Sequence, residues 1–133
     1  MNQITQKENK TELIYKEESY LIIGACMEVH KELGRGFNEI VYKDALEYEF
    51  KQRKIPYERE KGFLINYKEI ILPRQFISDF IMFGKIILEI KAVDELISSF
   101  RRQTLNYMKI TKYKLGIIGN FGEDSFKYQR LVL

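Results

Sequence analysis

The stretch that decides the fold is FISDFIMFGKIILEIKAV, residues 76–93. Two apolar runs flank the turn-like sequence FGK, residues 83–85, and this pattern predicts a β-hairpin. Three charged residues, Asp79, Glu89 and Lys91, interrupt the apolar runs. Because an unpaired charge inside a protein is costly, we expect these three side chains to serve a chemical purpose rather than packing.

The alternation of side chains along a strand places the three charges on one face. Asp79, Glu89 and Lys91 are all odd-numbered, and the other positions on both faces are mostly apolar. This predicts a central hairpin that is covered on both sides. If the turn has three residues, 83–85, Asp79 lies opposite Glu89 with Cβ atoms about 5 Å apart. A two-residue turn would send the two acids to opposite faces.

Two carboxylates at that separation repel each other, and a divalent cation removes the repulsion. Mg²⁺ takes oxygen ligands, typically one or two carboxylates with water and substrate phosphate. Bound by Asp79 and Glu89, Mg²⁺ or Mn²⁺ could activate a water, and Lys91 could stabilise charge developing on the phosphate. The alternative is an internal salt-bridge cluster of the three charges, although buried ion clusters usually cost more than an apolar replacement.

The spacing Glu-x-Lys carries little weight alone, because it occurs three times in the chain. The pair Glu8–Lys10 falls in a polar tail, and Glu49–Lys51 falls on a solvated helix face. Only Glu89–Lys91 lies on an apolar strand with an acid opposite it. The hairpin context therefore makes this copy the candidate site.

The rest of the chain predicts helices that pack on a mixed β-sheet. Apolar residues recur at helical spacing in the segments 12–33, 38–53 and 94–112, with Asn38 and Asp94 as the expected N-caps. Short apolar runs predict strands at 61–67, 69–73, 76–83, 86–93, 114–121 and 126–133. The order is α-α-β-β-β-β-α-β-β, which indicates an α/β fold with a mixed sheet flanked by helices.

Helical periodicity also predicts which side chains face inward. It places Leu21 on the apolar stripe of the first helix and Ile40 on that of the second. On the third helix, Gln103 falls within the inward stripe one turn before Tyr107, so the two share a face. An inward amide and phenol could brace Lys91 or contact a phosphate. The alternative for Gln103 is a core glutamine that hydrogen-bonds to the backbone.

The composition is that of a soluble globular protein, with 45% hydrophobic and 31% charged residues. We expect a flexible tail over 1–11 and a single domain over 12–133. One cysteine, Cys26, excludes an intramolecular disulfide and suits a reducing compartment. Neither a signal peptide nor a membrane-spanning run is visible, so we expect a cytoplasmic protein without a membrane partner.

Positive charge gathers on and after the third predicted helix. The net charge of +3 permits a nucleic-acid partner without arguing for one. Such charges usually form a solvated face, although they would also suit a phosphate backbone. The candidate nucleic-acid-binding residues are Arg101, Arg102, Lys109 and Lys112.

Several separated motifs, in this order, resemble the GxxExxY family over roughly residues 14–133. That family is placed in the PD-(D/E)XK phosphodiesterase superfamily, whose members share a restriction-endonuclease-like core and mostly cut nucleic acid with Mg²⁺. The matching residues are Gly36, Glu39 and Tyr42 in GFNEIVY, then Asp79, Glu89-Ile90-Lys91, Gln103-x-x-x-Tyr107 and GIIGNFG at 116–122. One departure is Ser78, which stands where the superfamily's name has proline.

The resemblance implies a role for each part of the hairpin. Asp79 and Glu89 would be metal ligands, with the carbonyl of Ile90 as another. Lys91 would be the catalytic lysine. Gln103 and Tyr107 resemble a helix motif of the exonuclease-like branch of the superfamily and are counted with the catalytic residues.

Two residues outside the hairpin are further candidate metal ligands by the same resemblance. Glu39 would reach the ion from the second helix, or else be a carboxylate stabilised by that helix's N-terminal dipole. His30 would touch the metal as a histidine does in some relatives, or else have a capping or packing role.

The resulting hypothesis is a Mg²⁺- or Mn²⁺-dependent nuclease of restriction-endonuclease-like fold. Its expected partner is nucleic acid, DNA in the first place, and a homodimer or larger assembly is an open possibility. The alternative is a catalytically silent nucleic-acid-binding or protein-interaction module of the same fold.

Overall fold

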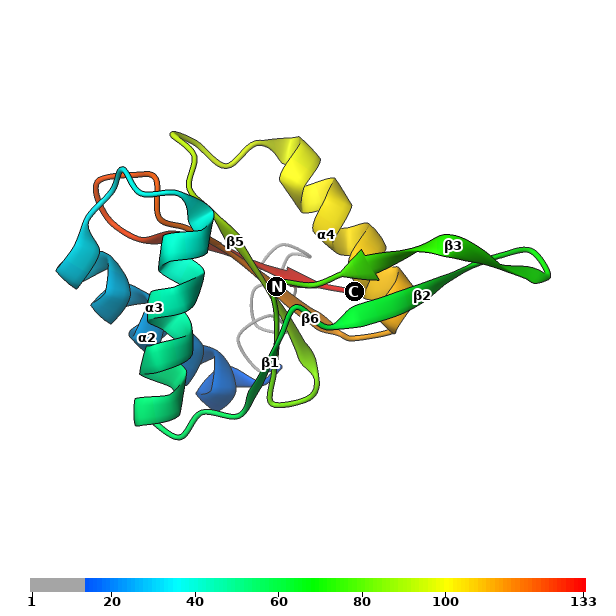
Figure 1. The fold of residues 1–133 in the computed structure, drawn as a ribbon, viewed down its shortest axis with the longest axis horizontal. Helices are drawn as coiled ribbons and strands as arrows, with labels where there is room; N and C mark the ends of the chain where they lie inside the picture. Colours follow the sequence, from blue (N-terminus) through cyan, green and yellow to red (C-terminus); the bar gives the residue numbers. More distant parts are fainter. Residues whose placement is uncertain (1–13) are drawn as a thin grey trace, which may run out of the picture.

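The structure is a computed structural model that describes residues 14–133, so the expected tail, residues 1–11, lies outside it. The described residues form three helices and seven strands (Figure 1). The helices are α2 (Lys16–Leu33), α3 (Glu39–Gln52) and α4 (Ser98–Thr111). The strands are β1 (Tyr57–Arg59), β2 (Gly62–Tyr67), β3 (Ile70–Ile77), β4 (Phe80–Met82), β5 (Ile86–Lys91), β6 (Leu115–Asn120) and β7 (Lys127–Val132).

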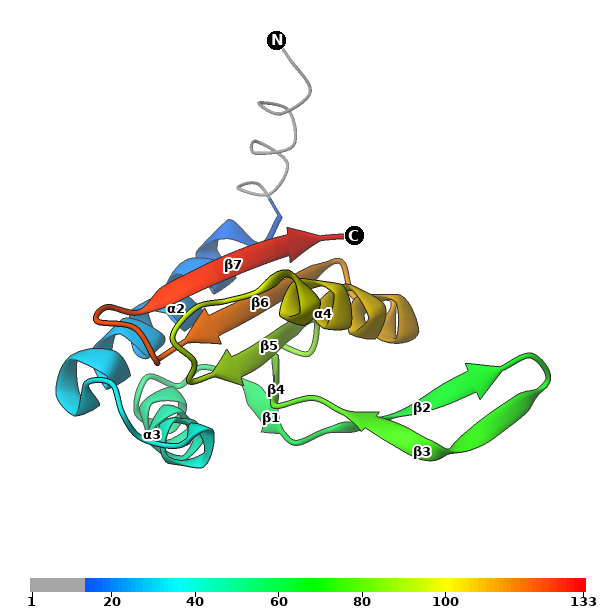
Figure 2. The same cartoon turned by 90° about the horizontal axis from the view of Figure 1, so that it is seen from above.

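Five of these strands make one mixed sheet in the order β1-β4-β5-β6-β7. Strands β5 and β6 run parallel, and the other neighbours are antiparallel. Helices α2 and α3 lie on one side of the sheet and α4 on the other, while β2 and β3 form a separate hairpin that projects from the body (Figure 2). The predicted α/β class, with a mixed sheet flanked by helices, is confirmed.

The β4–β5 hairpin contributes to a core on each face of the sheet. Phe80 and Leu88 belong to the core beneath α2 and α3, whereas Ile81 and Ile87 belong to the core beneath α4. All four side chains are fully buried. The predicted two-sided cover of this hairpin is therefore confirmed.

The register of the hairpin is also the predicted one. Phe80 pairs with Leu88 and Met82 pairs with Ile86, which leaves residues 83–85 as a three-residue turn. The Lys85 N–H donates to the Met82 carbonyl (3.0 Å) and closes the turn. Phe83 and Gly84 both adopt positive φ, 54° and 68°, which suits glycine and strains phenylalanine.

Strand boundaries differ from the prediction around the candidate acid. The expected strands 69–73 and 76–83 are rearranged into β3 and β4, with a break at Ser78 and Asp79. The break exists because the chain changes partners there: the Ser78 N–H donates to the Lys61 carbonyl, and the Glu60 N–H donates to the Asp79 carbonyl (both 2.9 Å). Strand β1, which carries two charges in three residues, was not predicted.

Of the two predicted N-caps, Asn38 has the predicted position and Asp94 does not. Asn38 occupies the N-cap position of α3 but makes no side-chain capping bond. Helix α4 begins at Ser98 rather than at Asp94, whose carboxylate pairs with Arg35 (3.3 Å). Helix α4 begins later than predicted because Asn120 fixes the chain at Val93. The Asn120 side chain donates to the Val93 carbonyl (2.9 Å) and accepts from the Val93 N–H (3.0 Å).

Three predicted inward positions are exposed instead: Leu21, Ile40 and Gln103. In α3 the buried residues are Tyr42, Leu46 and Phe50, so the helix is rotated relative to the predicted stripe. Tyr42 sets that rotation by stacking on Phe121 (ring centroids 4.6 Å apart) and donating its hydroxyl to the Gly34 carbonyl (2.6 Å). In α4 the fully buried residues are Thr104 and Met108, which turns Gln103 toward solvent.

Cys26 is fully buried on α2, and burial raises the pKa of its thiol. Among the helices of residues 14–133, none is long and apolar enough to cross a membrane.

Gly122 shows how closely the β6–β7 connection packs on the chain after β5. A Cβ at this position would collide with the backbone of Val93. We therefore expect Gly122→Ala to lower the free energy of unfolding by about 2 kcal/mol, measured by urea denaturation. Gly24→Ala is the matched control, because its new Cβ would only touch the end of Arg53 at 3.6 Å. Equal stability of the two variants would contradict this packing.

Candidate active site

The centre of the site is the pair Asp79 and Glu89. Asp79 lies in the break before β4, and Glu89 lies in β5, whose partner on the other side is β6. The Ile90 N–H donates to Asp79 Oδ2 (2.8 Å), and the Asp79 N–H donates to Glu89 Oε2 (3.3 Å). The hairpin register thus brings the two acids together, as the three-residue turn predicts.

Glu89 is an acid in an apolar environment. Glu89 is only 7% exposed, and its Oε1 has no hydrogen-bond partner within residues 14–133. Burial and, next, the charge of Asp79 raise the pKa of Glu89 to about 9, with Lys91 opposing the shift weakly. Without a further cation, Glu89 therefore holds a proton at neutral pH.

Asp79 is neutralised by a residue of helix α3 that the sequence did not single out. Lys43 Nζ lies 3.2 Å from Asp79 Oδ1 and 3.4 Å from Glu60 Oε1. Burial opposes protonation of the amine, but the two carboxylates together raise the pKa of Lys43. The side chain of Asp79 is still 21% exposed, so solvent reaches the acid pair from this side.

Lys91 is not part of a closed salt-bridge cluster. No ion pair of Lys91 is found within residues 14–133, and its Nζ lies 4.7 Å from the centroid of the Phe100 ring. The half-buried ammonium is thus held by a cation–π contact beside the acids rather than bonded to them. The self-satisfying cluster of Asp79, Glu89 and Lys91 that the sequence left open does not form.

Helix α4 contributes Tyr107 to the surroundings of the acids. Its ring stacks on Phe76 (centroids 3.6 Å apart), and burial, followed by the charges of Glu89 and Asp79, raises its pKa. Gln103, one turn earlier, is exposed on the same helix. The core-glutamine alternative is therefore wrong for Gln103.

His30 and Glu39 are not brought to the acid pair. His30 Nε2 donates to the Glu123 carbonyl (2.8 Å), and the ring stacks on Phe121, which is the packing role left open for it. Glu39 is exposed at the first residue of α3, where the helix dipole favours an acid. In the described part of the chain, no three His, Cys, Asp or Glu side chains gather to hold an ion.

The family comparison matches nearly the whole described chain. Residues 16–131 match the family profile described as the PD-(D/E)XK nuclease superfamily. The chain belongs to this superfamily. The motif-based expectation is thereby confirmed at superfamily level, and its GxxExxY branch is compatible with the match. Members of the PD-(D/E)XK superfamily are in general nucleases.

Comparison of solved structures supports the same fold. The crystal structure of SSO0001 aligns with a TM-score of 0.57 and 18% sequence identity, over 95% of this chain. The chain spans only 61% of SSO0001. At this identity the likeness shows the fold and nothing about activity. No curated protein matches the chain.

The donor atoms of this PD-(D/E)XK site fit a hard divalent cation. Asp79 and Glu89 supply carboxylate oxygens, and Ile90, whose carbonyl is a further candidate ligand, follows Glu89 directly in the sequence. Mg²⁺ and Mn²⁺ favour such oxygen ligands. The buried Glu89 Oε1, which lacks any partner in residues 14–133, is the atom that most needs a cation.

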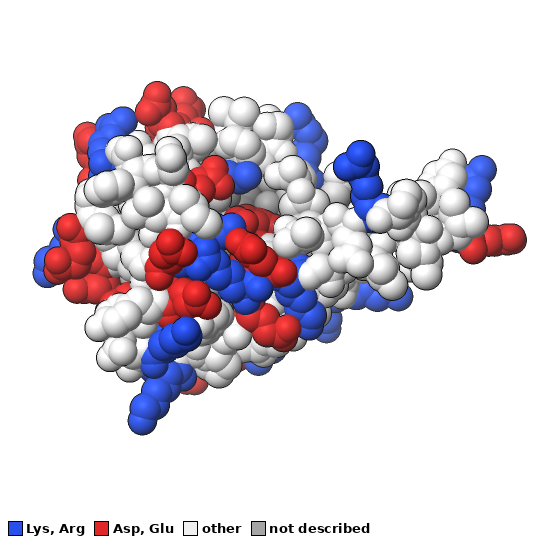
Figure 3. Space-filling model, in the orientation of Figure 1, with Lys and Arg blue, Asp and Glu red and all other residues white. Residues whose placement is uncertain are grey.

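Lys43 is the functional neighbour that sequence reasoning missed. Only its position on the helix relative to the buried residues could have indicated this contact from the sequence. Lys43 follows the buried Tyr42 directly and precedes the buried Leu46 by three residues. A surface lysine has the same signal, so the contact becomes visible only in three dimensions. Figure 3, in the orientation of Figure 1, shows acidic and basic side chains that alternate in the middle of the face turned to the viewer, beside a hollow between α3 and α4.

The predicted nucleic-acid-binding residues are exposed and do not belong to the buried face of α4. Arg101, Arg102 and Lys109 are exposed on this helix, and Lys112 is exposed just after it. Arg102 donates to Ser98 Oγ (3.3 Å), one turn back. Their charges therefore remain available at the surface of α4.

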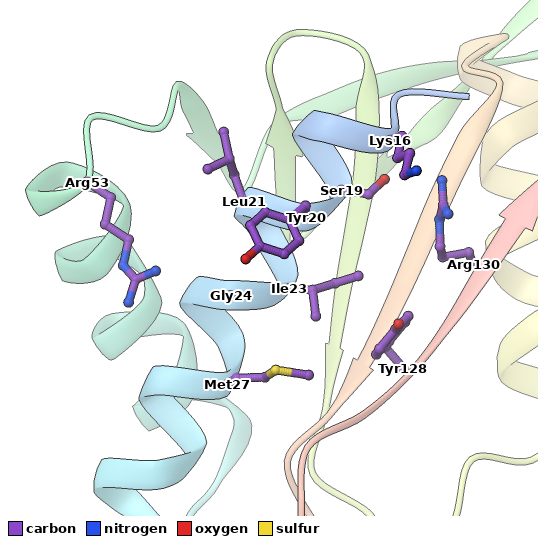
Figure 4. Close-up of a pocket in the computed structure, with 10 residues that line it drawn as sticks. All are labelled: Lys16, Ser19, Tyr20, Leu21, Ile23, Gly24, Met27, Arg53, Tyr128 and Arg130. Atoms are coloured by element: carbon purple, nitrogen blue, oxygen red, sulfur yellow. The ribbon is translucent and has the colours of Figure 1, made fainter. Parts of the chain in front are cut away.

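A groove of about 500 Å³ lies elsewhere, along α2 (Figure 4). Basic and aromatic side chains line it together with aliphatic ones, including Arg53 from the end of α3 and Tyr128 from β7. No residue of the acid pair or of its surroundings lines this groove. The groove along α2 is therefore separate from the candidate acid pair.

The protonated state of Glu89 predicts a pH-dependent stability. Because its folded pKa is about 9 and its ordinary value 4.5, the native state keeps a proton that the unfolded chain loses, so stability falls as pH rises from about 5 to 9. Glu89→Gln should remove this slope and exceed the wild type by roughly 1–3 kcal/mol at pH 8. Urea denaturation in EDTA at several pH values measures it. The exposed Glu95→Gln is the control, and parallel wild-type and Glu89→Gln curves would contradict the assignment.

Proposed function

We propose that this PD-(D/E)XK domain is a metal-dependent nuclease that hydrolyses phosphodiester bonds of nucleic acid, with DNA as the first candidate substrate. The observation that carries the proposal is the bonded pair Asp79 and Glu89, with the ammonium of Lys91 nearby and engaged by no carboxylate of residues 14–133. In a closed salt-bridge cluster, the ammonium of Lys91 would be paired with a carboxylate. A site prepared for chemistry leaves that ammonium available.

Each residue of the site has a defined task in this proposal. Asp79 and Glu89, with the Ile90 carbonyl, hold Mg²⁺ or Mn²⁺. The bound ion supplies Lewis-acid polarisation of the phosphate and a lowered pKa for water. Lys91 orients the attacking water and stabilises the negative charge that grows on the phosphate. Glu89 would release its proton to solvent on binding the ion, because a carboxylate and not a carboxylic acid is the metal ligand.

Helix α4 positions the strand. Tyr107, fixed by its stacking on Phe76, and the exposed Gln103 can contact the phosphate next to the scissile one. The exposed Arg101, Arg102 and Lys109 neutralise backbone phosphates, which positions the nucleic acid without reading its sequence.

For the domain boundaries, the compartment and the assembly, the proposal keeps the expectations from the sequence. Residues 12–133 act as one domain, in the cytoplasm, and a homodimer or larger assembly remains compatible with it. His30 is left out of the ligand set because its ring bonds to the Glu123 carbonyl, and Glu39 because it is exposed at the start of α3 and joins no group of three ligand residues within residues 14–133.

The Lys43–Asp79 ion pair favours a second candidate function. A cluster that is neutralised by the chain's own lysine could serve a catalytically silent nucleic-acid-binding module. Metal distinguishes the two candidates. The silent module would bind nucleic acid equally well with and without Mn²⁺ and would cut none.

The decisive experiment is incubation of the protein with end-labelled single- and double-stranded DNA and RNA, with Mn²⁺ or with EDTA. Cleavage should require the metal, and Lys91→Ala should lower its rate about 10²–10³-fold. Asp79→Asn should abolish it. The matched control is Lys51→Ala, which alters the other structured Glu-x-Lys pair, exposed on α3. Equal losses in both lysine variants, or metal-independent cleavage, would reject the proposal.

The basic residues of α4 predict a salt dependence of binding. The double variant Arg101→Ala/Arg102→Ala should weaken binding to every sequence alike and reduce the slope of log K against log salt by about 2. Fluorescence anisotropy with labelled DNA in EDTA measures this slope. The control double variant is Lys31→Ala/Lys51→Ala, on helices of the opposite side of the sheet. An unchanged slope in the α4 variant would show that nucleic acid binds elsewhere.

A further inference from the structure

The carboxylate oxygens of the acid pair are unequally occupied. Asp79 Oδ2 accepts the Ile90 N–H, and Glu89 Oε2 accepts the Asp79 N–H. These two oxygens face the backbone and fix the geometry of the pair. The remaining two are Glu89 Oε1, which has no partner within residues 14–133, and Asp79 Oδ1, which is held by Lys43.

Lys43 therefore already supplies a cation to one of the two oxygens that a metal needs. Its side chain is only 13% exposed, so the ammonium is not a loosely solvated surface charge. An ammonium and a divalent ion on the same carboxylate oxygen repel each other, and they repel strongly where water is scarce. Lys43 and a divalent ion therefore cannot both bind Asp79 Oδ1 strongly.

The second partner of Lys43 gives the ammonium somewhere to remain. Glu60 Oε1 lies 3.4 Å from Lys43 Nζ, and the Glu60 side chain is 52% exposed. The Glu60 N–H donates to the Asp79 carbonyl, so the backbone holds the two acids side by side. Lys43 can thus leave Asp79 without losing all charge compensation.

We infer that Lys43 is the resident cation of the acid pair: it occupies Asp79 Oδ1 in the metal-free protein and withdraws to Glu60 when a divalent ion binds. The inference rests on the proposed function, because it assigns a role to Lys43 at the same metal site. Lys43 and the ion compete for one oxygen. Lys43 is accordingly a positioning residue that keeps Asp79 in place before the ion arrives and lowers the affinity of the site for it.

The first test measures Mn²⁺ binding by isothermal titration calorimetry. Lys43→Met should bind Mn²⁺ about tenfold more tightly than the wild type, because its competitor is gone. The matched control is Lys61→Met, which removes the same charge nearby but breaks only a pair with Glu58 and a cation–π contact with Phe63, neither of which involves the acid pair. Equal affinity of Lys43→Met and wild type, or an equal gain in Lys61→Met, would overturn the inference.

The same titrations show whether the site or the inference has failed. Asp79→Asn should abolish Mn²⁺ binding. If it does so while Lys43→Met binds no more tightly than the wild type, the proposed metal site stands and the role of Lys43 is rejected. If Asp79→Asn binds Mn²⁺ like the wild type, both are rejected.

A second measurement uses the wild-type protein and does not depend on how Lys43→Met folds. Nitrogen-15 NMR of the lysine ammonium groups follows Lys43 during titration with Mg²⁺. Its signal should shift as Mg²⁺ saturates the site, whereas that of Lys85, held by Glu18 at 2.7 Å, should stay in place. A Lys43 signal that is unmoved at saturation, judged from the Asp79 and Glu89 carboxyl carbons, would overturn the inference.

Discussion

The site depends on the hydrogen bond from the Ile90 N–H to Asp79 Oδ2 (2.8 Å), which exists only in one register of the hairpin. The three-residue turn 83–85 sets that register, and Phe83 accepts positive φ to make it. A slip by one residue would exchange the two faces of the strand. It would send the two acids to opposite faces, so the apolar packing that fixes the register of the sheet also aligns the acids.

The cost of this alignment is electrostatic, and the chain lowers it in two ways. Glu89, which lies deepest, keeps a proton, since burial and Asp79 raise its pKa to about 9. Asp79 is paired with the ammonium of Lys43. One acid is neutral and the other is paired, so the pair is tolerable without a metal. A structural core would have no reason to place two acids there, because apolar residues would stabilise it more.

Sequence patterns predicted what depends on strand alternation and missed what depends on helix rotation. The period of two fixed the faces of residues 76–93, and the length of the turn fixed the pairing of Asp79 with Glu89. The inward positions of α3 and α4 were partly wrong, because Tyr42 stacks on Phe121 and rotates its helix. The contact between Lys43 and Asp79 joins residues 36 positions apart. No local pattern encodes such a contact.

The two lysines of the site illustrate why the same side chain can have opposite roles. Lys91 shares a strand with Glu89 and rests on Phe100, so an aromatic ring compensates its charge and leaves the ammonium free of carboxylates in the described chain. Lys43 comes from a helix and is held by two carboxylates. An ammonium on a ring is weakly held and can turn to a phosphate, whereas one that is bonded to carboxylates must first be displaced from them. The partner of each lysine, rather than its charge, separates the candidate catalytic group from the resident counter-ion.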